Sequence, residues 1–224
     1  MTAAARCRGS PPEVMRLRVA LRDVLPTPWR RLEIGTAATL ADLHAALQAA
    51  MGWQDLHLHR FRILGRQYDP EYADVGQIRL ASLCLRAGER FSYEYNLSVP
   101  WLHEIRVEAV QPGVAGRRYP RCVAGSHAGP PEWCPGPEAL DELKGELLGL
   151  SYVEDMELMA EFGRAVLAMR DGVVRDPLDA VGVDDLRRAL ARQERREALT
   201  APFDRRRADA ALDRLTAANA GAVP

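Results

Sequence analysis

Two neighbouring segments differ in hydrophobic period, and this difference limits the fold more than any single residue does. Between residues 15 and 22 apolar side chains alternate with polar ones, mostly arginine. A period of two predicts a β-strand with one solvated face. Between residues 39 and 52 apolar side chains recur every three or four positions instead, which predicts an amphipathic helix. The chain is therefore expected to build a sheet and a helix into one core.

The predicted helix has start and stop signals, and further strand patterns flank it. Thr39 and Asp42 are spaced like a loose capping box, and Gly52 is a natural C-terminal stop. Further strand-like runs are found at 26–34, 57–64, 91–95 and 102–110. The order strand, strand, helix, strand and further strands predicts an α+β fold, with a mixed or antiparallel sheet packed on a helix. We interpret its core as β-grasp-like, ββαβ(β), with a helical C-terminal extension.

The composition predicts four segments along the chain. Residues 1–13 are small, polar and proline-containing, which favours a disordered leader, and residues 14–150 hold the α+β core. Residues 151–198 have helical periodicity and are expected to pack on the core. Residues 199–224 are charged and alanine-rich, which indicates a marginal helix or a disordered tail.

Charge and cysteine content exclude several classes of protein. A formal net charge of -1 lacks the basic excess of a protein that mainly grips phosphate backbones. Four cysteines in 224 residues are too sparse for a disulfide scaffold, so we expect reduced thiols. No apolar stretch approaches the roughly 20 residues that cross a bilayer. A cytoplasmic protein without membrane contact is expected.

Strand parity places histidines on apolar faces. His59 shares its face with Phe61, and His103 shares its face with Ile105. Imidazoles that meet at a sheet edge beside a cysteine-bearing loop have the chemistry of a transition-metal site. The alternative is that each histidine is buried and satisfied by an ordinary hydrogen-bond partner. His44, on the helix, is interpreted as a surface residue.

A catalytic interpretation pairs His103 with Glu104, or His59 with Glu132, and takes a cysteine as nucleophile. Glu104 has the opposite strand parity to His103, so the two cannot face one pocket without a bulge. The sequence holds no GxSxG elbow, phosphate-binding glycine loop or HExxH helix. An enzyme is therefore the less favoured hypothesis.

Arginines predict a second kind of surface. The side chains expected on the outer sheet face could bind nucleic acid through its phosphates. They are Arg16, Arg18, Arg22, Arg30, Arg31, Arg60 and Arg62. The alternative is a solvated face on which glutamates such as Glu33 and Glu108 pair with them. Acidic side chains that interrupt the surface would distinguish the two.

Several of these segments together resemble the plasmid pRi ORF-3-like family of bacterial proteins. The resemblance is carried by PTPWRRLEI, TLADLHAALQAAMGWQDLHLHRFRILGRQY, FSYEYN, WLHEIRVEAV and YPRCVAGSHAGPPEWCPGP, within about residues 14 to 150. It implies an α+β fold and no established activity. Trp101 stands in the family's Trp-x-His-Glu motif, and with His59, His103 and Glu132 it is a candidate binding residue.

The resemblance also bears on the cysteine loop. Family members commonly carry a cysteine where this chain has Gly129, so a zinc site in relatives would have lost one ligand here. His127 could replace it, which predicts a zinc set of Cys122, His127 and Cys134, with His103 as a fourth ligand. The alternative is a proline-stiffened loop anchored by Trp133, with Cys122 simply buried. Zinc is the one cofactor that the sequence suggests.

From these observations we expect a non-enzymatic binding module linked to plasmid or mobile-element biology. Its partner would be a protein or a nucleic acid bound at the arginine face. A metal-dependent enzyme that uses a His/Cys site is the alternative.

Overall fold

The computed structural model describes residues 13–71 and 73–221, so the leader expected at 1–13 lies almost entirely outside the described residues. The chain forms two compact units. The sheet unit comprises the residues up to Glu132 and those from Pro202 onward, and the helical unit comprises Trp133–Ala201. The domain limits expected at residues 150 and 198 stay predictions.

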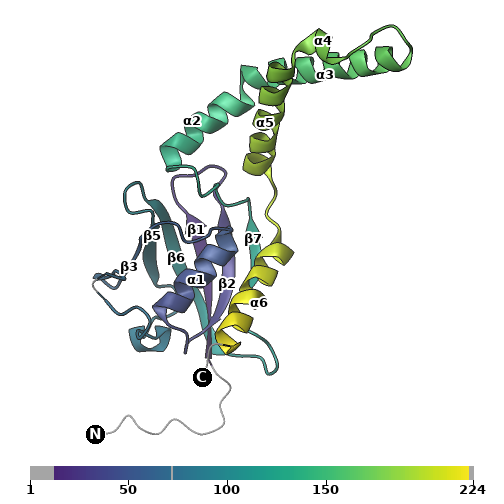
Figure 1. The fold of residues 1–224 in the computed structure, drawn as a ribbon. Helices are drawn as coiled ribbons and strands as arrows, with labels where there is room; N and C mark the ends of the chain where they lie inside the picture. Colours follow the sequence, from purple (N-terminus) through teal and green to yellow (C-terminus); the bar gives the residue numbers. More distant parts are fainter. Residues whose placement is uncertain (1–12, 72, 222–224) are drawn as a thin grey trace, which may run out of the picture. The chain divides into compact units, whose positions relative to one another are not determined.

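The sheet unit holds all the strands (Figure 1). Its elements are β1 (Glu13–Leu21), β2 (Trp29–Gly35), α1 (Leu40–Met51), β3 (His59–Ile63), β4 (Arg66–Tyr68), the short 3-10 helix η1 (Leu80–Leu83), β5 (Arg90–Tyr95), β6 (Trp101–Pro112), β7 (Arg121–Ser126) and α6 (Arg205–Gly221). The strands form one sheet in the order β4-β3-β5-β6-β1-β2-β7, and each pair of neighbours is antiparallel. The α+β class is confirmed. A β-grasp-like core is not confirmed, because β1 pairs antiparallel with β6.

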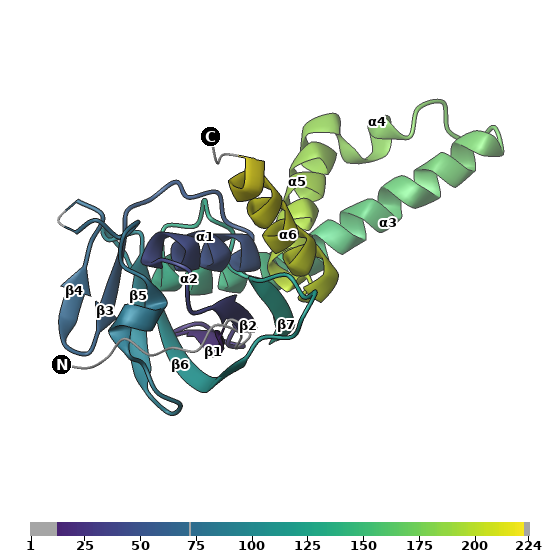
Figure 2. The same ribbon diagram turned by 90° about the horizontal axis from the view of Figure 1, so that it is seen from below.

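Helix α1 begins and ends where the sequence predicts. The Thr39 side chain accepts a hydrogen bond from the Asp42 backbone N–H, and the Thr39 N–H donates to the Asp42 carboxylate, which completes the capping box. Gly52 has a φ of 86°, the left-handed conformation that glycine adopts at little cost. The apolar stripe of α1 is buried, and Figure 2 shows the helix lying along one face of the sheet.

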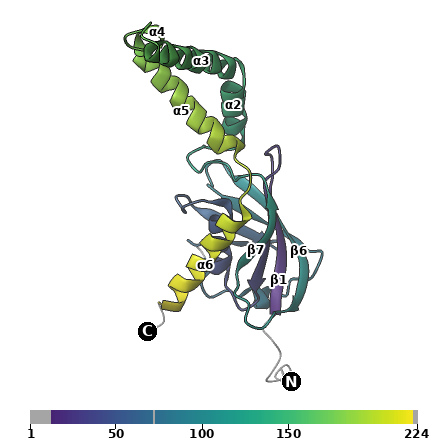
Figure 3. The same ribbon diagram turned by 90° about the vertical axis from the view of Figure 1, so that its right-hand side faces the viewer.

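The inner sheet face and α1 form the core. Alternate residues of β1, Leu17, Val19 and Leu21, are fully buried, as the period of two predicts. Helix α6 packs beside α1 and β7 with Leu212 buried (Figure 3), so much of the segment after residue 199 is an ordered helix.

One arginine that was predicted on the outer face of the sheet lies on its inner face. Arg30 was expected on the outer face beside Arg31, but it has the strand parity of Leu32 and Ile34 and is 1% exposed. Adjacent residues of a strand point to opposite faces, so Arg30 and Arg31 cannot both face outward.

The helical unit consists of α2 (Pro137–Leu148), α3 (Leu150–Arg170), α4 (Leu178–Val181) and α5 (Val183–Thr200). At its centre Asp155 of α3 is buried and accepts hydrogen bonds from Arg192 and Arg196 of α5. The bond from Arg192 is the main cause that lowers the pKa of Asp155. None of the helices in the described ranges is both long enough and apolar enough to span a membrane.

Candidate functional site

The inner faces of β3, β5 and β6 place His59, Tyr93 and His103 beneath α1. Tyr93 is the register partner of both Phe61 on β3 and His103 on β6. Its ring centroid lies 5.9 Å from that of His59 and 5.3 Å from that of His103. Both histidines are buried on the apolar face, as strand parity predicts. Tyr93, on the strand between them, contacts both rings.

His44 joins this group, and its interpretation as a surface residue is wrong. Its side chain is buried and its ring stacks on His59, with centroids 3.5 Å apart and planes inclined by 9°. The helical period contained the signal: residue 44 lies four positions after Leu40 and three before Leu47, both of which are buried. The alternation at 91–95 likewise places Tyr93 on the buried face of its strand, whereas the loop after α1 carried no comparable signal in the sequence.

A chain of hydrogen bonds joins Asp55, Gln48, Tyr93 and His44. The Gln48 carbonyl oxygen accepts from the Asp55 N–H at 3.2 Å, so the Gln48 amide nitrogen faces Tyr93 and donates to its hydroxyl at 2.9 Å. The Tyr93 hydroxyl lies 2.8 Å from His44 Nδ1, and the tautomer of His44 sets which of the two donates.

His44 Nε2 lies 2.9 Å from Asp55 Oδ1, but the direction of this contact is not that of a hydrogen bond. Within the described residues, the Nε2 atoms of His59 and His103 also have no hydrogen-bond partner. Burial lowers the pKa of His103 to about 4. Burial, together with the neighbouring His44, lowers the pKa of His59 to about 4. Burial also lowers the pKa of His44. All three rings are neutral at pH 7.

Glu132 holds the loop between α1 and β3. Its carboxylate accepts hydrogen bonds from the backbone N–H groups of Gln54 at 2.6 Å and Leu56 at 3.1 Å. The Tyr95 hydroxyl donates to the same carboxylate. Trp101, a predicted binding residue, is buried nearby, within an aromatic cluster that includes Trp53 and Tyr95. Glu132 thus has a positioning role in this structure.

The proline-rich segment is attached through a different tryptophan from the expected one. Trp133 is 58% exposed, whereas Trp53 is buried and donates from its indole nitrogen to the Pro130 carbonyl at 2.8 Å. The anchor belongs to the loop after α1, which approaches the proline segment only in the folded chain.

The zinc set of Cys122, His127 and Cys134 stays a prediction. Cys122 is buried and its thiol donates to the Ala124 carbonyl, while the Cys134 thiol, in the helical unit, donates to the Gly136 carbonyl. Burial raises the pKa of Cys122 to about 11 and also raises that of Cys134. The His127 carbonyl accepts from Arg30. In the absence of a metal, both cysteines are protonated thiols.

Acidic side chains interrupt the arginine face. Arg16 pairs with Glu33 at 2.8 Å, and Arg31 pairs with Glu108 at 2.6 Å. Arg60 and Arg62 both contact Glu94. The hydrogen bond from Arg31 is the main cause that lowers the pKa of Glu108. This cross-strand pairing of arginines with glutamates is the predicted alternative to a nucleic-acid-binding face.

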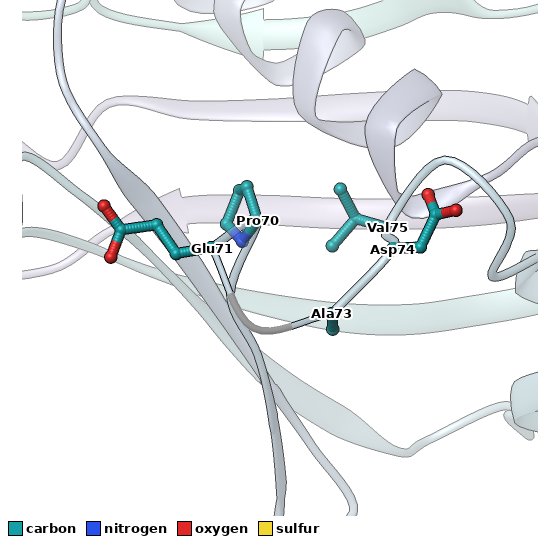
Figure 4. A pocket seen from close by; sticks show the side chains of 5 residues that line it. All are labelled: Pro70, Glu71, Ala73, Asp74 and Val75. Carbon is teal, nitrogen blue, oxygen red and sulfur yellow. The ribbon is translucent and has the colours of Figure 1, made fainter.

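Two further features bear on ligands. An open surface pocket is lined by Pro70, Glu71, Ala73, Asp74 and Val75 (Figure 4). Its described lining residues include two carboxylates, Glu71 and Asp74, and no histidine. Among the described residues, the group whose side chains could hold a metal ion is His44, Asp55 and His59.

Together, the fold and the site define an α+β protein whose antiparallel sheet covers a buried histidine–tyrosine cluster. The chain belongs to the plasmid pRiA4b ORF-3-like protein family, whose profile matches residues 13–162. This confirms the resemblance seen in the sequence.

Two similar proteins extend the comparison. The uncharacterized protein y4hQ of Sinorhizobium fredii is 34% identical over 137 residues, which cover 58% of this chain and 70% of that protein. The crystal structure of a protein of unknown function, MM3350 from Methanosarcina mazei Go1, has 27% sequence identity and a TM-score of 0.56. The match covers 65% of this chain and 88% of that one. Neither relative carries an assigned activity.

Proposed function

We propose that this chain is a non-enzymatic, cytoplasmic binding module linked to plasmid biology, and that its helical unit binds a basic, amphipathic segment of a protein partner. The family description, which names a plasmid open reading frame, supports the biological setting. The binding role rests on helix α3.

Helix α3 leaves most of its apolar side chains in solvent. Of its 21 residues only Asp155 and Ala165 are buried. The exposed apolar side chains are Leu150, Tyr152, Val153, Met156, Val166, Leu167 and Met169. Monomeric proteins seldom expose so much apolar surface on one element, and such surfaces commonly mark protein interaction sites. Exposure of α3 is the observation that carries the proposal.

Charge specifies the chemistry of the partner. Along α2 and α3, acidic residues other than the buried Asp155 outnumber Lys144, Arg164 and Arg170; they are Glu138, Asp141, Glu142, Glu146, Glu154, Glu157 and Glu161. Methionine adds an adaptable apolar surface through Met156 and Met169. An acidic, methionine-bearing surface is complementary to a helix with one apolar face and one basic face.

The two competing classes have weaker support. Acidic partners neutralise much of the arginine face that nucleic acid would require. The raised pKa values of Cys122 and Cys134 disfavour the thiolate that a cysteine nucleophile needs. The raised thiol pKa values thus give no support to a metal-dependent enzyme at the cysteine loop.

A labelled peptide tests the proposal. The probe is an 18-residue leucine–lysine peptide with helical periodicity, compared by fluorescence anisotropy with a permuted peptide of equal composition. We expect saturable binding of the first peptide only. Val153→Ser/Met156→Ser should weaken it about tenfold, a loss of roughly 1.4 kcal/mol.

Val114→Ser is the matched control, because Val114 is 51% exposed in the sheet unit and Val153 is 53% exposed on α3. Equal binding of both peptides, or no effect of the α3 variant, would overturn the proposal. Light scattering that shows a dimer dissolved by the α3 variant would also overturn it, because the occupant would then be a second copy of the chain.

A further inference from the structure

Three side chains with metal-binding chemistry meet where the loop after α1 passes β3. One ring nitrogen of His44, one of His59 and one carboxylate oxygen of Asp55 all lie within 4.8 Å of one another. Ligand atoms about 2.0–2.2 Å from a common zinc ion are separated by less than this distance. Small movements of the side chains would therefore bring the three ligand atoms onto one ion.

We propose that His44, His59 and Asp55 form a binding site for a divalent first-row transition-metal ion of the zinc class. Two neutral imidazoles and a carboxylate are a ligand set that suits such ions. The site contains none of the cysteines of the predicted zinc set, and it does not depend on the peptide-binding role proposed for α3.

An independent observation comes from the unsatisfied nitrogens. His59 is 8% exposed, and its buried Nε2 has no hydrogen-bond partner in the described ranges. A buried polar atom without a partner destabilises the folded chain. His44 Nε2 lies 2.9 Å from Asp55 Oδ1 without hydrogen-bond geometry. A bound cation would give all three atoms a partner.

The charge of the site also favours a cation. Imidazole binds a metal ion in its neutral form, so the two rings add no positive charge that would oppose the ion. Asp55 supplies the negative charge, and its side chain is 56% exposed, which gives an ion access from solvent. Within the described ranges no arginine is paired with Asp55.

Metal binding requires one of the two rings to rotate. Lone pairs lie in the ring plane, and the stacked rings, 3.5 Å apart and inclined by only 9°, keep the lone pairs in two nearly parallel planes. A common ion therefore needs a rotation of at least one ring. Tyr93 would orient the ring of His44: with the ion on Nε2, the ring proton is on Nδ1, which donates to the Tyr93 oxygen. Such an outer hydrogen bond is typical of metal-bound histidine.

Zinc titration of the full-length chain, purified and then dialysed against chelator, tests the site. Isothermal titration calorimetry should show one ion per chain, and cobalt(II) should give the visible absorption of a low-coordinate nitrogen–oxygen site. Asp55→Asn should weaken zinc binding at least about tenfold, because the substitution removes the charged ligand. His59→Ala should abolish the cobalt spectrum.

The chain supplies a close control for the aspartate variant. Asp23 and Asp55 are both exposed, and each has a φ of 60°. Asparagine tolerates this left-handed conformation, so neither Asp23→Asn nor Asp55→Asn should unfold the chain. Asp23→Asn should leave zinc affinity unchanged.

Three results would overturn the proposal: no zinc binding by the wild-type chain, equal affinity in Asp55→Asn and Asp23→Asn, or loss of the ion only in Cys122→Ser/Cys134→Ser. The last would assign the ion to the cysteine loop. The α3 variant Val153→Ser/Met156→Ser should retain zinc. The proposal of a metal site and the proposal of a peptide-binding surface can therefore be refuted independently.

Discussion

The guanidinium carbon of Arg30 lies 4.0 Å from the ring centroid of Phe203, so a cation buried in β2 packs against the segment that leads into α6. Four backbone carbonyls complete its surroundings. Arg30 donates to Ala50 at the end of α1, to Trp29, and to Ser126 and His127 at the end of β7. Burial lowers the pKa of Arg30 to about 10, and the side chain stays charged. One arginine thus joins four segments of the sheet unit.

Arg30→Met should destabilise the sheet unit by about 2–4 kcal/mol, because it leaves buried carbonyls without donors. Urea unfolding followed by tryptophan fluorescence measures the change. Arg31→Met is the control: Arg31 is a third exposed and pairs with Glu108 on the outer face, so we expect a loss below about 1 kcal/mol. Similar losses in both variants would contradict the role given to Arg30.

Gly129→Cys should destabilise the chain. A Cβ atom at Gly129 would lie 2.5 Å from the Met51 carbonyl oxygen, which is backbone at the end of α1. The end of the helix must move, at a cost of about 1–3 kcal/mol in thermal or urea unfolding. Gly35→Ala, with nothing within 4 Å of its added Cβ, should be almost neutral. A Gly129→Cys variant as stable as the wild-type chain would show that the end of α1 can shift to make room for the added side chain.

Glu132→Ala should loosen the loop between α1 and β3. The substitution removes the acceptor for the Gln54 and Leu56 N–H groups and for the Tyr95 hydroxyl. We expect faster hydrogen exchange at these two amides and a stability loss of about 1–2 kcal/mol. Glu104→Ala, which removes surface ion pairs with Arg22 and Arg90, should leave exchange in the loop unchanged. Unchanged protection in Glu132→Ala would refute this positioning role.

The buried histidines should make stability depend on pH. His59 and His103 have pKa values of about 4 in the folded chain, against about 6.5 when unfolded. The unfolded state therefore binds more protons between these values, and stability falls as pH drops from about 6.5 towards 4. His59→Phe should remove roughly 1–2 kcal/mol of the loss between pH 7.5 and 5.

Urea midpoints at the two pH values measure this effect, with His57→Phe as the control. His57 lies two residues away and is partly exposed. The same pH dependence in His59→Phe and the wild-type chain would show that His59 is not responsible.

Part of the site can be predicted from the sequence, because it depends on the hydrophobic period within single strands and helices. The alternation in β3 and β6 is enough to place His59 and His103 on the inner face, and the spacing from Leu40 to Leu47 is enough to bury His44. The family resemblance singled out Trp101 and Glu132 but could not assign Glu132 its contacts. Those contacts involve Gln54 and Leu56, far from Glu132 along the chain.

The sequence by itself determined the strand and helix periods, the capping box at Thr39 and the family, since each depends on neighbours within a few residues or on an ordered set of motifs. Only the tertiary structure decided that His44 stacks on His59, that glutamates neutralise the arginine face, and that Phe203 covers Arg30. Strand register and helix docking bring these residues together from distant parts of the chain. No local pattern encodes which of the many possible distant pairings buries the most apolar surface while satisfying the polar groups.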